Sequence, residues 1–208
     1  MEWHTFDGLV DYRKAVDCMV SRVSDIVKGK KPEAIWMLEH PSVYTAGTSV
    51  REEELPCGSR FSVVRTTRGG RCSYHGPGQR VVYVMLDLKR RERKDVRLYV
   101  RNLGLWVAGT LAEFGVNSYF DNDNVGIWVR PASGPAKKIA AFGIAVRSWV
   151  TYHGFSVNVN TDLNCYTGIA PCGLHSTSVT SLQSLGVTLS LEDVDAALKR
   201  QFRKVFPD

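Results

Sequence analysis

The order of helical and strand-like segments most constrains how this chain can fold. Apolar residues recur at steps of three and four over residues 7–28, over 96–114 and from 191 onward, which predicts three amphipathic helices. Between them lie β-like runs at residues 34–38, 62–65, 81–85, 126–129, 139–149 and 155–159. Because helices and strands do not alternate strictly, we expect a single α+β domain over residues 1–208, with a mixed β-sheet flanked by helices.

Polar and glycine residues mark the expected helix ends. Asp7 and Asp95 are candidate N-caps of the first two helices, and Gly29 and Gly115 are candidate stops. The third helix follows Ser190, where Ser-Leu-Glu-Asp resembles a capping box with Asp in place of Glu.

Composition and charge are those of an ordinary globular protein. Hydrophobic residues make up 44% and charged residues 23% of the 208 residues. No apolar run approaches the roughly 18 residues of a membrane helix, and the first residues lack a signal-peptide pattern. We expect a cytoplasmic monomer without membrane association, and we expect the apolar run 34–38 to form a central strand.

The cysteines argue against a disulfide framework or a structural metal site. They are Cys18, Cys57, Cys72, Cys165 and Cys172. Their number is odd and no pair has C-x-x-C spacing, so neither a disulfide framework nor a zinc site is expected.

Basic residues concentrate in one segment. The net charge is +6, and residues 89–101 carry much of the positive charge. This segment is either a solvated loop and helix start or a docking surface for an acidic macromolecule, such as nucleic acid or an acidic carrier protein. No nucleic-acid-binding fingerprint is present.

Residues 68–79 form the most unusual segment, with four glycines and a proline between two predicted strands. Glycine lets backbone approach a ligand closely, and His75 could donate a hydrogen bond to a ligand carbonyl. The alternative is a surface turn with an incidental histidine. The segment lacks the phosphate-loop pattern.

A cysteine and a lysine are candidates for acyl-transfer chemistry. Cys172 lies next to Gly173 in a loop, and a lysine ammonium beside a thiol favours the nucleophilic thiolate. Lys138 begins a strongly apolar run, either as a solvent-facing strand-edge residue or as a partner of the thiol. His153, just before another predicted strand, is either a core or turn histidine or a pocket residue.

Taken together and in order, these segments resemble the lipoyl(octanoyl) transferase family of lipoate biosynthesis. The patterns that match are R-G-G-x-x-T-Y-H-G-P-G-Q at residues 68–79, K-I-A-A-[IV]-G at 138–143, H-G-[FL]-A-L-N at 153–158, P-C-G at 171–173 and E-H-P-x-x-Y-T-x-G at 39–47.

The resemblance implies the fold of biotin and lipoate protein ligases, with Cys172 as the acyl-accepting cysteine and Lys138 as the lysine that lowers its pKa. Accessory residues are expected at Gly76, His153 and Gly173. The implied acyl pocket consists of Arg68, Gly69, Gly70, Arg71, Cys72, Ser73, Tyr74, His75, Ala141, Phe142, Gly143, Gly154, Phe155 and Ser156.

The implied reaction transfers an octanoyl group from acyl carrier protein to a lysine of a lipoyl domain, through a thioester on Cys172. The implied acceptors are the lipoyl domains of 2-oxoacid dehydrogenase E2 subunits and the glycine cleavage H protein. Because the donor is already a phosphopantetheine-linked thioester, no cofactor, ATP or metal is expected, and neither is a nucleic-acid partner.

The chain departs from the family pattern inside the implied pocket. Ser73 replaces the usual Thr and keeps its hydroxyl. Ser156 replaces the usual Ala and adds a hydroxyl to the implied pocket. Phe142 is larger than the usual Ile or Val and could shorten the pocket. The alternatives to a transferase are an ATP-dependent ligase of the same fold, a cysteine hydrolase and a non-catalytic basic binding protein.

Overall fold

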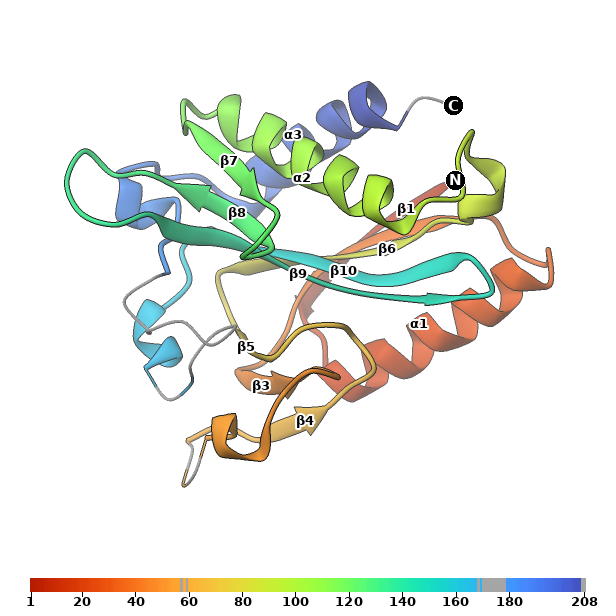
Figure 1. Ribbon diagram of the computed structural model, residues 1–208, viewed down its shortest axis with the longest axis horizontal. Helices are drawn as coiled ribbons and strands as arrows, with labels where there is room; N and C mark the ends of the chain where they lie inside the picture. The colour runs from red at the N-terminus through yellow and green to blue at the C-terminus, as the bar shows by residue number, and fades with distance from the viewer. Residues whose placement is uncertain (57, 59, 168, 170–178, 207–208) are drawn as a thin grey trace.

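The computed structural model describes residues 1–56, 58, 60–167, 169 and 179–206. Within them, seven strands form a mixed sheet with the order β1-β2-β6-β10-β9-β8-β7 (Figure 1). β1 pairs with β2 in parallel, and the other neighbours in the sheet are antiparallel. The strands are β1 (Glu2–Leu9), β2 (Ala34–Glu39), β6 (Gln79–Met85), β7 (Ser118–Asp121), β8 (Gly126–Val129), β9 (Lys137–Arg147) and β10 (Val150–Asn158).

Helices cover both faces of this sheet. α2 (Val96–Ala112) and α3 (Leu191–Val205) lie on one face, and α1 (Tyr12–Val27) lies on the other (Figure 1). The predicted α+β class with a mixed sheet and three helices is confirmed. Short 3₁₀ turns are η1 (Glu52–Glu54), η2 (Leu88–Arg90), η3 (Leu163–Tyr166) and η6 (Gln183–Leu185).

Each face of the sheet has its own apolar core. The fully buried Trp106 of α2 packs against Phe155 of β10 and Phe202 of α3, and its indole N–H donates to the Leu198 carbonyl at 2.8 Å. On the opposite face, Met19 and Val23 of α1 pack in one cluster with residues of β2, β6 and β10. Burial on both sides explains why these strands are so continuously apolar.

A smaller sheet lies beside the α1 face. Its order is β4-β3-β5, with β3 (Val43–Ala46), β4 (Val63–Arg65) and β5 (Cys72–His75). This sheet carries the glycine-rich segment to the lower edge of the main sheet as drawn in Figure 1. It therefore forms the second wall of the site described below.

The start of the first helix was predicted wrongly. Residues of β1 pair with β2 as far as Leu9 opposite Glu39, and Gly8 has a left-handed φ of +66° that a helix cannot continue through. Asp11, not Asp7, caps α1, because its carboxylate accepts the Lys14 backbone N–H at 3.0 Å.

The other helix ends agree with their predictions. The Asp95 side chain accepts two backbone N–H groups of α2, and Ser190 with Asp193 forms the predicted capping box of α3. β1, β3, β5 and β7 were not predicted. β2 is an interior strand, as expected, but β10 occupies the middle of the sheet. None of the described helices has the length and apolar character needed to cross a membrane.

Candidate active site

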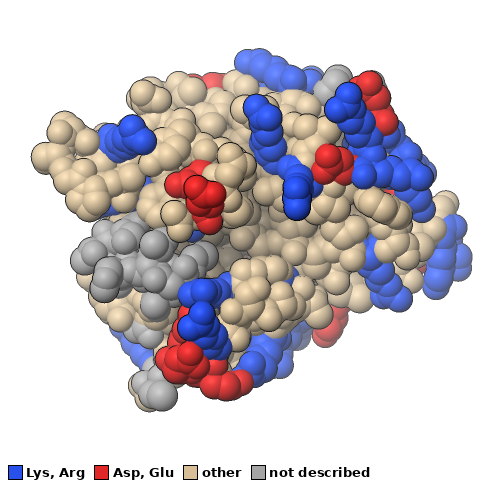
Figure 2. All heavy atoms as spheres, in the orientation of Figure 1, with Lys and Arg blue, Asp and Glu red and all other residues tan. Residues whose placement is uncertain are grey.

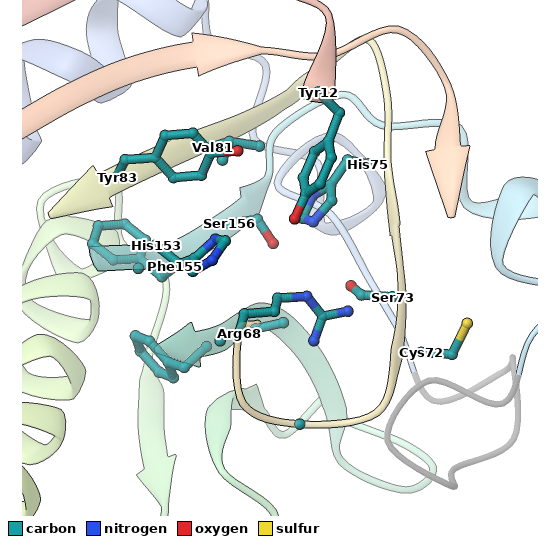
Figure 3. Close-up of a pocket in the computed structure, with 15 residues that line it drawn as sticks. Tyr12, Arg68, Cys72, Ser73, His75, Val81, Tyr83, His153, Phe155 and Ser156 are labelled. Carbon is teal, nitrogen blue, oxygen red and sulfur yellow. The ribbon is translucent and has the colours of Figure 1, made fainter. Parts of the chain in front are cut away.

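A narrow pocket of about 40 Å³ lies between the main sheet and the glycine-rich segment (Figure 3). Eleven of the fourteen predicted pocket residues line it: Arg68, Gly70, Cys72, Ser73, His75, Ala141, Phe142, Gly143, Gly154, Phe155 and Ser156. The fold thus brings together three segments that are far apart in sequence. Their contact with a substrate stays a prediction.

The other three predicted pocket residues do not line this cavity. Gly69 donates its N–H to the Ile144 carbonyl at 3.0 Å, and Arg71 forms an ion pair with Glu54 at 2.8 Å. The buried Tyr74 hydroxyl lies 2.9 Å from Ser42 Oγ, within the cluster of the small sheet. These residues shape the segment rather than the pocket surface.

Three lining residues were missed by the sequence analysis. Tyr12, Val81 and Tyr83 line the pocket from α1 and β6. Tyr12 and Val81 were assigned only to an apolar helix face and a strand. Their side chains are aromatic or branched, and such side chains do not show from sequence alone whether a residue lines a pocket or lies in the core.

Arg68 organises the glycine-rich segment. Its buried guanidinium donates to the Thr45 carbonyl at 2.7 Å, to the Arg71 carbonyl at 2.9 Å and to the Gly69 carbonyl at 3.0 Å. Charge-assisted hydrogen bonds of this kind are stronger than neutral ones. Arg68 therefore holds the segment against β3, and it also forms part of the pocket wall (Figure 3).

Hydrogen bonds fix the tautomers of two histidines near the pocket. His40 Nδ1 lies 2.6 Å from the Val10 carbonyl, so it carries the proton, and Nε2 accepts from the Tyr83 hydroxyl at 2.9 Å. The Gln79 amide nitrogen donates to the Tyr74 carbonyl, which leaves the Gln79 amide oxygen to accept from His75 Nδ1 at 2.6 Å. His75 Nε2 is then an acceptor. The expected hydrogen-bond donation from His75 to a ligand carbonyl does not fit this tautomer.

Burial keeps the histidines beside the pocket neutral. It lowers the pKa of His40 to about 4, and the pKa of both His75 and His153 to about 3. The positive charge of Arg68 also lowers the pKa of His75 and His153. Near neutral pH the pocket therefore presents uncharged imidazoles.

Lys138 is buried at the start of β9, with 3% of its surface exposed. This excludes the solvent-facing alternative. Its Nζ donates to the Val125 carbonyl at 3.1 Å and lies 5.0 Å from the centroid of the Trp128 ring. An ammonium in this position is held by a carbonyl and an aromatic face.

Lys138 lines a second cavity of about 20 Å³ beside the pocket. Ser73, Ala141 and Ser156 line both cavities and form the wall that they share. The lysine is therefore separated from the pocket by small side chains only.

Cys172 and Gly173 lie outside the described residues. The described residues on either side of that segment are Ile169 and Val179, and both pack in the cluster that contains Cys72 and Tyr166. Val179 forms a bridge with Lys138 and also lines the lysine cavity.

Two other predicted residues have clear positions. Gly76 lies outside the pocket lining, and a side chain there would collide with the Tyr74 ring. Cys72 is buried and lies beyond Ser73 as seen from His153 (Figure 3). Among the described residues, no cluster of His, Cys, Asp or Glu could hold a metal ion.

The family model for the lipoyl protein ligase A/B catalytic domain matches residues 11–203. An octanoyltransferase of Anaplasma marginale is 64% identical over 99% of this chain and 96% of its own length. The chain belongs to the octanoyltransferase family. A second member, from Anaplasma phagocytophilum, is 56% identical, and the match covers 99% of each chain.

Solved structures with the same fold extend beyond this family. A bipartite lipoate protein ligase from Thermoplasma acidophilum has a TM-score of 0.73 and 17% identity, over 99% of this chain and 84% of that one. A biotin protein ligase from Aquifex aeolicus has a TM-score of 0.55 and 10% identity, over 99% of this chain and 68% of that one. The predicted likeness to both ligase folds is confirmed.

Proposed function

We propose that this protein transfers an octanoyl group from octanoyl-acyl carrier protein to a lysine of a lipoyl domain. We further propose that it does so as a single catalytic domain over residues 1–208, acting as a monomer in the cytoplasm. Its membership of the octanoyltransferase family supports the activity. The observation that carries the mechanism is the buried Lys138, in a cavity that shares a wall with the pocket.

Cys172 is the proposed nucleophile and Lys138 its activating partner. Ile169, three residues before Cys172, and Val179, seven residues after it, pack in one cluster, and Val179 also lines the lysine cavity. The chain therefore leaves the segment that contains Cys172 beside Lys138. A nearby ammonium favours the thiolate, which is the reactive form of cysteine.

The proposed reaction consists of two successive acyl transfers, with a thioester on Cys172 between them. First, the Cys172 thiolate attacks the carbonyl of the donor thioester. The carrier's phosphopantetheine sulfur leaves as a thiolate and takes a proton from Lys138. Second, the neutral amine of the acceptor lysine attacks the Cys172 thioester, which forms an amide and releases the Cys172 thiolate. The proton lost by the amine returns to Lys138. Because an amide is more stable than a thioester, the second step drives the cycle without ATP.

The pocket is the proposed site of the acyl chain. Its walls include the rings of Phe142 and Phe155, and burial of each methylene contributes roughly 0.8 kcal/mol. A cavity of about 40 Å³ has room for roughly three water molecules, so side chains must move apart when an acyl chain enters. Phe142 is only partly buried and can give way.

The lipoyl domains of 2-oxoacid dehydrogenase E2 subunits and the glycine cleavage H protein are the proposed acceptors. We place the docking of the acidic carrier on the basic segment between η2 and α2. Figure 2 shows Lys and Arg side chains gathered there, at the upper right of the view. A groove of about 510 Å³ lies at this segment and is lined by Arg90, Arg91 and Arg93 among others.

Local acids already pair with part of this basic segment. Arg91 contacts Glu33 at 2.9 Å, and both Lys89 and Arg90 lie 3.8 Å from Asp87. Reversal of the exposed Arg93 and Lys94 to Glu is therefore the sharper test. It should raise KM for the carrier at low salt, an effect that salt weakens. Lys28→Glu with Lys30→Glu, beyond the end of α1, is the matched control. Equal KM values for both variants would exclude the basic segment as the docking surface of the carrier.

The decisive experiment incubates the protein with octanoyl-acyl carrier protein in the absence of ATP. Mass spectrometry should find one octanoyl group on Cys172, which addition of a lipoyl domain discharges. Lys138→Met, which keeps most of the side-chain volume, should lose most of this adduct. An acyl transfer that requires ATP and survives Cys172→Ser would instead identify a ligase of the same fold.

A further inference from the structure

The backbone of β10 departs from a regular strand at His153. Its φ is +56°, in the left-handed region that non-glycine residues rarely adopt. Its N–H donates to the thioether sulfur of Met19 at 3.1 Å, a weak acceptor. Strain of this kind persists only where the surrounding structure imposes it, and it concentrates at functional sites.

The unusual backbone puts the His153 ring on the pocket side of the sheet. Consecutive residues of a regular strand point to opposite faces. Here the rings of Tyr152 and His153 are 5.2 Å apart, so the two neighbours share a face. The His153 ring also meets Tyr83 edge-on, with centroids 6.0 Å apart and an interplanar angle of 90°.

The strand pair next to His153 has little freedom to move. Gly154 lies opposite Tyr83 of β6 and Gly143 of β9, and a side chain at Gly154 would collide with the Val82 carbonyl. β10 is thus held from both sides. The position of the His153 ring is therefore fixed by the sheet, even where the pocket side chains move.

The register of β10 sets a distance between the lysine cavity and His153. Ser156 lies in the wall shared by the two cavities, and His153 precedes it by three residues. Three strand residues span about 10 Å. A zigzag of eight carbons with bonds of about 1.5 Å is about 9 Å long. Figure 3 shows His153 and Tyr83 on one side of the pocket and Ser73 on the other.

We propose that the His153 imidazole is the end wall of the acyl pocket and limits the bound chain to about eight carbons. This inference rests on the proposed function. His153 is 2% exposed, and its Nε2 lies 3.4 Å from Thr67 Oγ1. It is a specificity-determining residue, because it meets the methyl end of the chain and not the reacting carbonyl.

Replacement of His153 by glycine tests the end wall directly. Glycine adopts a positive φ without strain, and its lack of a side chain opens the end of the pocket. His153→Asn is the second variant, because asparagine tolerates this backbone and only shortens the side chain. Ser148→Gly is the matched control. Ser148 has a φ of +50° in the exposed β9–β10 turn, so its replacement relieves the backbone without touching the pocket.

The measurement is kcat/KM for hexanoyl-, octanoyl-, decanoyl- and dodecanoyl-acyl carrier protein, with thermal unfolding to confirm that each variant folds. Each added buried methylene is worth about fourfold. Decanoyl has two methylenes more than octanoyl, so the decanoyl-to-octanoyl ratio should rise by about fifteenfold in His153→Gly and by less in His153→Asn. It should stay unchanged in Ser148→Gly.

Two failures are distinguishable. If the unmodified protein accepts none of the four thioesters, the proposed function is wrong. If it transfers octanoyl, but the ratio in both His153 variants stays within twofold of the original, the end wall is not His153. An equal rise in Ser148→Gly would also overturn the inference, since it would trace the effect to the backbone alone.

Discussion

Acid should destabilise this protein already at pH values above those at which most carboxylates titrate. The cause is the set of buried neutral histidines His40, His75 and His153, whose rings lie close to one another and to Tyr83. Their pKa values are about 4, 3 and 3 in the folded protein, against 6.5 for an ordinary histidine. Unfolding therefore lets each ring take up a proton below pH 6.5.

The sign and size of the effect follow from this proton uptake. Between pH 6.5 and 4 the unfolded chain binds more protons, so the free energy of unfolding falls as the pH falls. At pH 5 each histidine removes about 2 kcal/mol relative to pH 8, and the three together about 6 kcal/mol. A typical domain has only about 5–15 kcal/mol in total. The loss is complete near the folded-state pKa values.

Urea unfolding at pH 8, 7, 6 and 5 measures this loss. His40→Gln, which cannot titrate, should reduce the difference between pH 8 and pH 5 by about 2 kcal/mol, whatever its effect at pH 8. His4→Gln on the exposed face of β1 is the control and should leave the difference unchanged. A total loss below about 2 kcal/mol, or no change in His40→Gln, would refute the reasoning.

Three further substitutions test the packing by urea unfolding at neutral pH. Ser190→Ala removes the N-cap of α3 and should cost about 1 kcal/mol, and full retention of stability would show that the cap contributes nothing. Gly154→Ala forces a methyl group against the Val82 carbonyl and should cost at least about 3 kcal/mol, whereas a cost under about 1 kcal/mol would mean that β10 can shift. Asp195→Ala leaves the buried Arg80, 2.8 Å from Asp195 Oδ1, without its partner and should cost about 3–5 kcal/mol, and a neutral result would contradict that pairing.

The parts of the fold that could be predicted are those with a strong local signal. The apolar period and the caps at Asp95 and Ser190 define α2 and α3 almost to the residue. The start of α1 could not be found, because the apolar pattern of residues 7–10 suits a helix as well as a strand. Pairing of Leu9 with Glu39 decides between them, and that contact is not local.

The site was predictable through motifs but not through geometry. The glycine-rich segment and the residues around Gly143 and Gly154 could be grouped by their resemblance to a family. Tyr83 could not, since its place in the pocket depends on the pairing of β6 with β10, which puts its ring against His153. The reversed direction of the His153 ring was also hidden, because backbone strain leaves no mark in the residue type.

The strand order of the main sheet has a consequence for synthesis on the ribosome. β6 pairs with β10, which is made only after α2 and strands β7 to β9 have emerged. Until then the nascent chain carries β6, buried over its whole length in the finished protein, with an unpaired edge. Such an edge is a template for association with other chains. Chains that terminate before Val150 should therefore aggregate, and the vulnerable period of translation ends when Asn158 has left the exit tunnel.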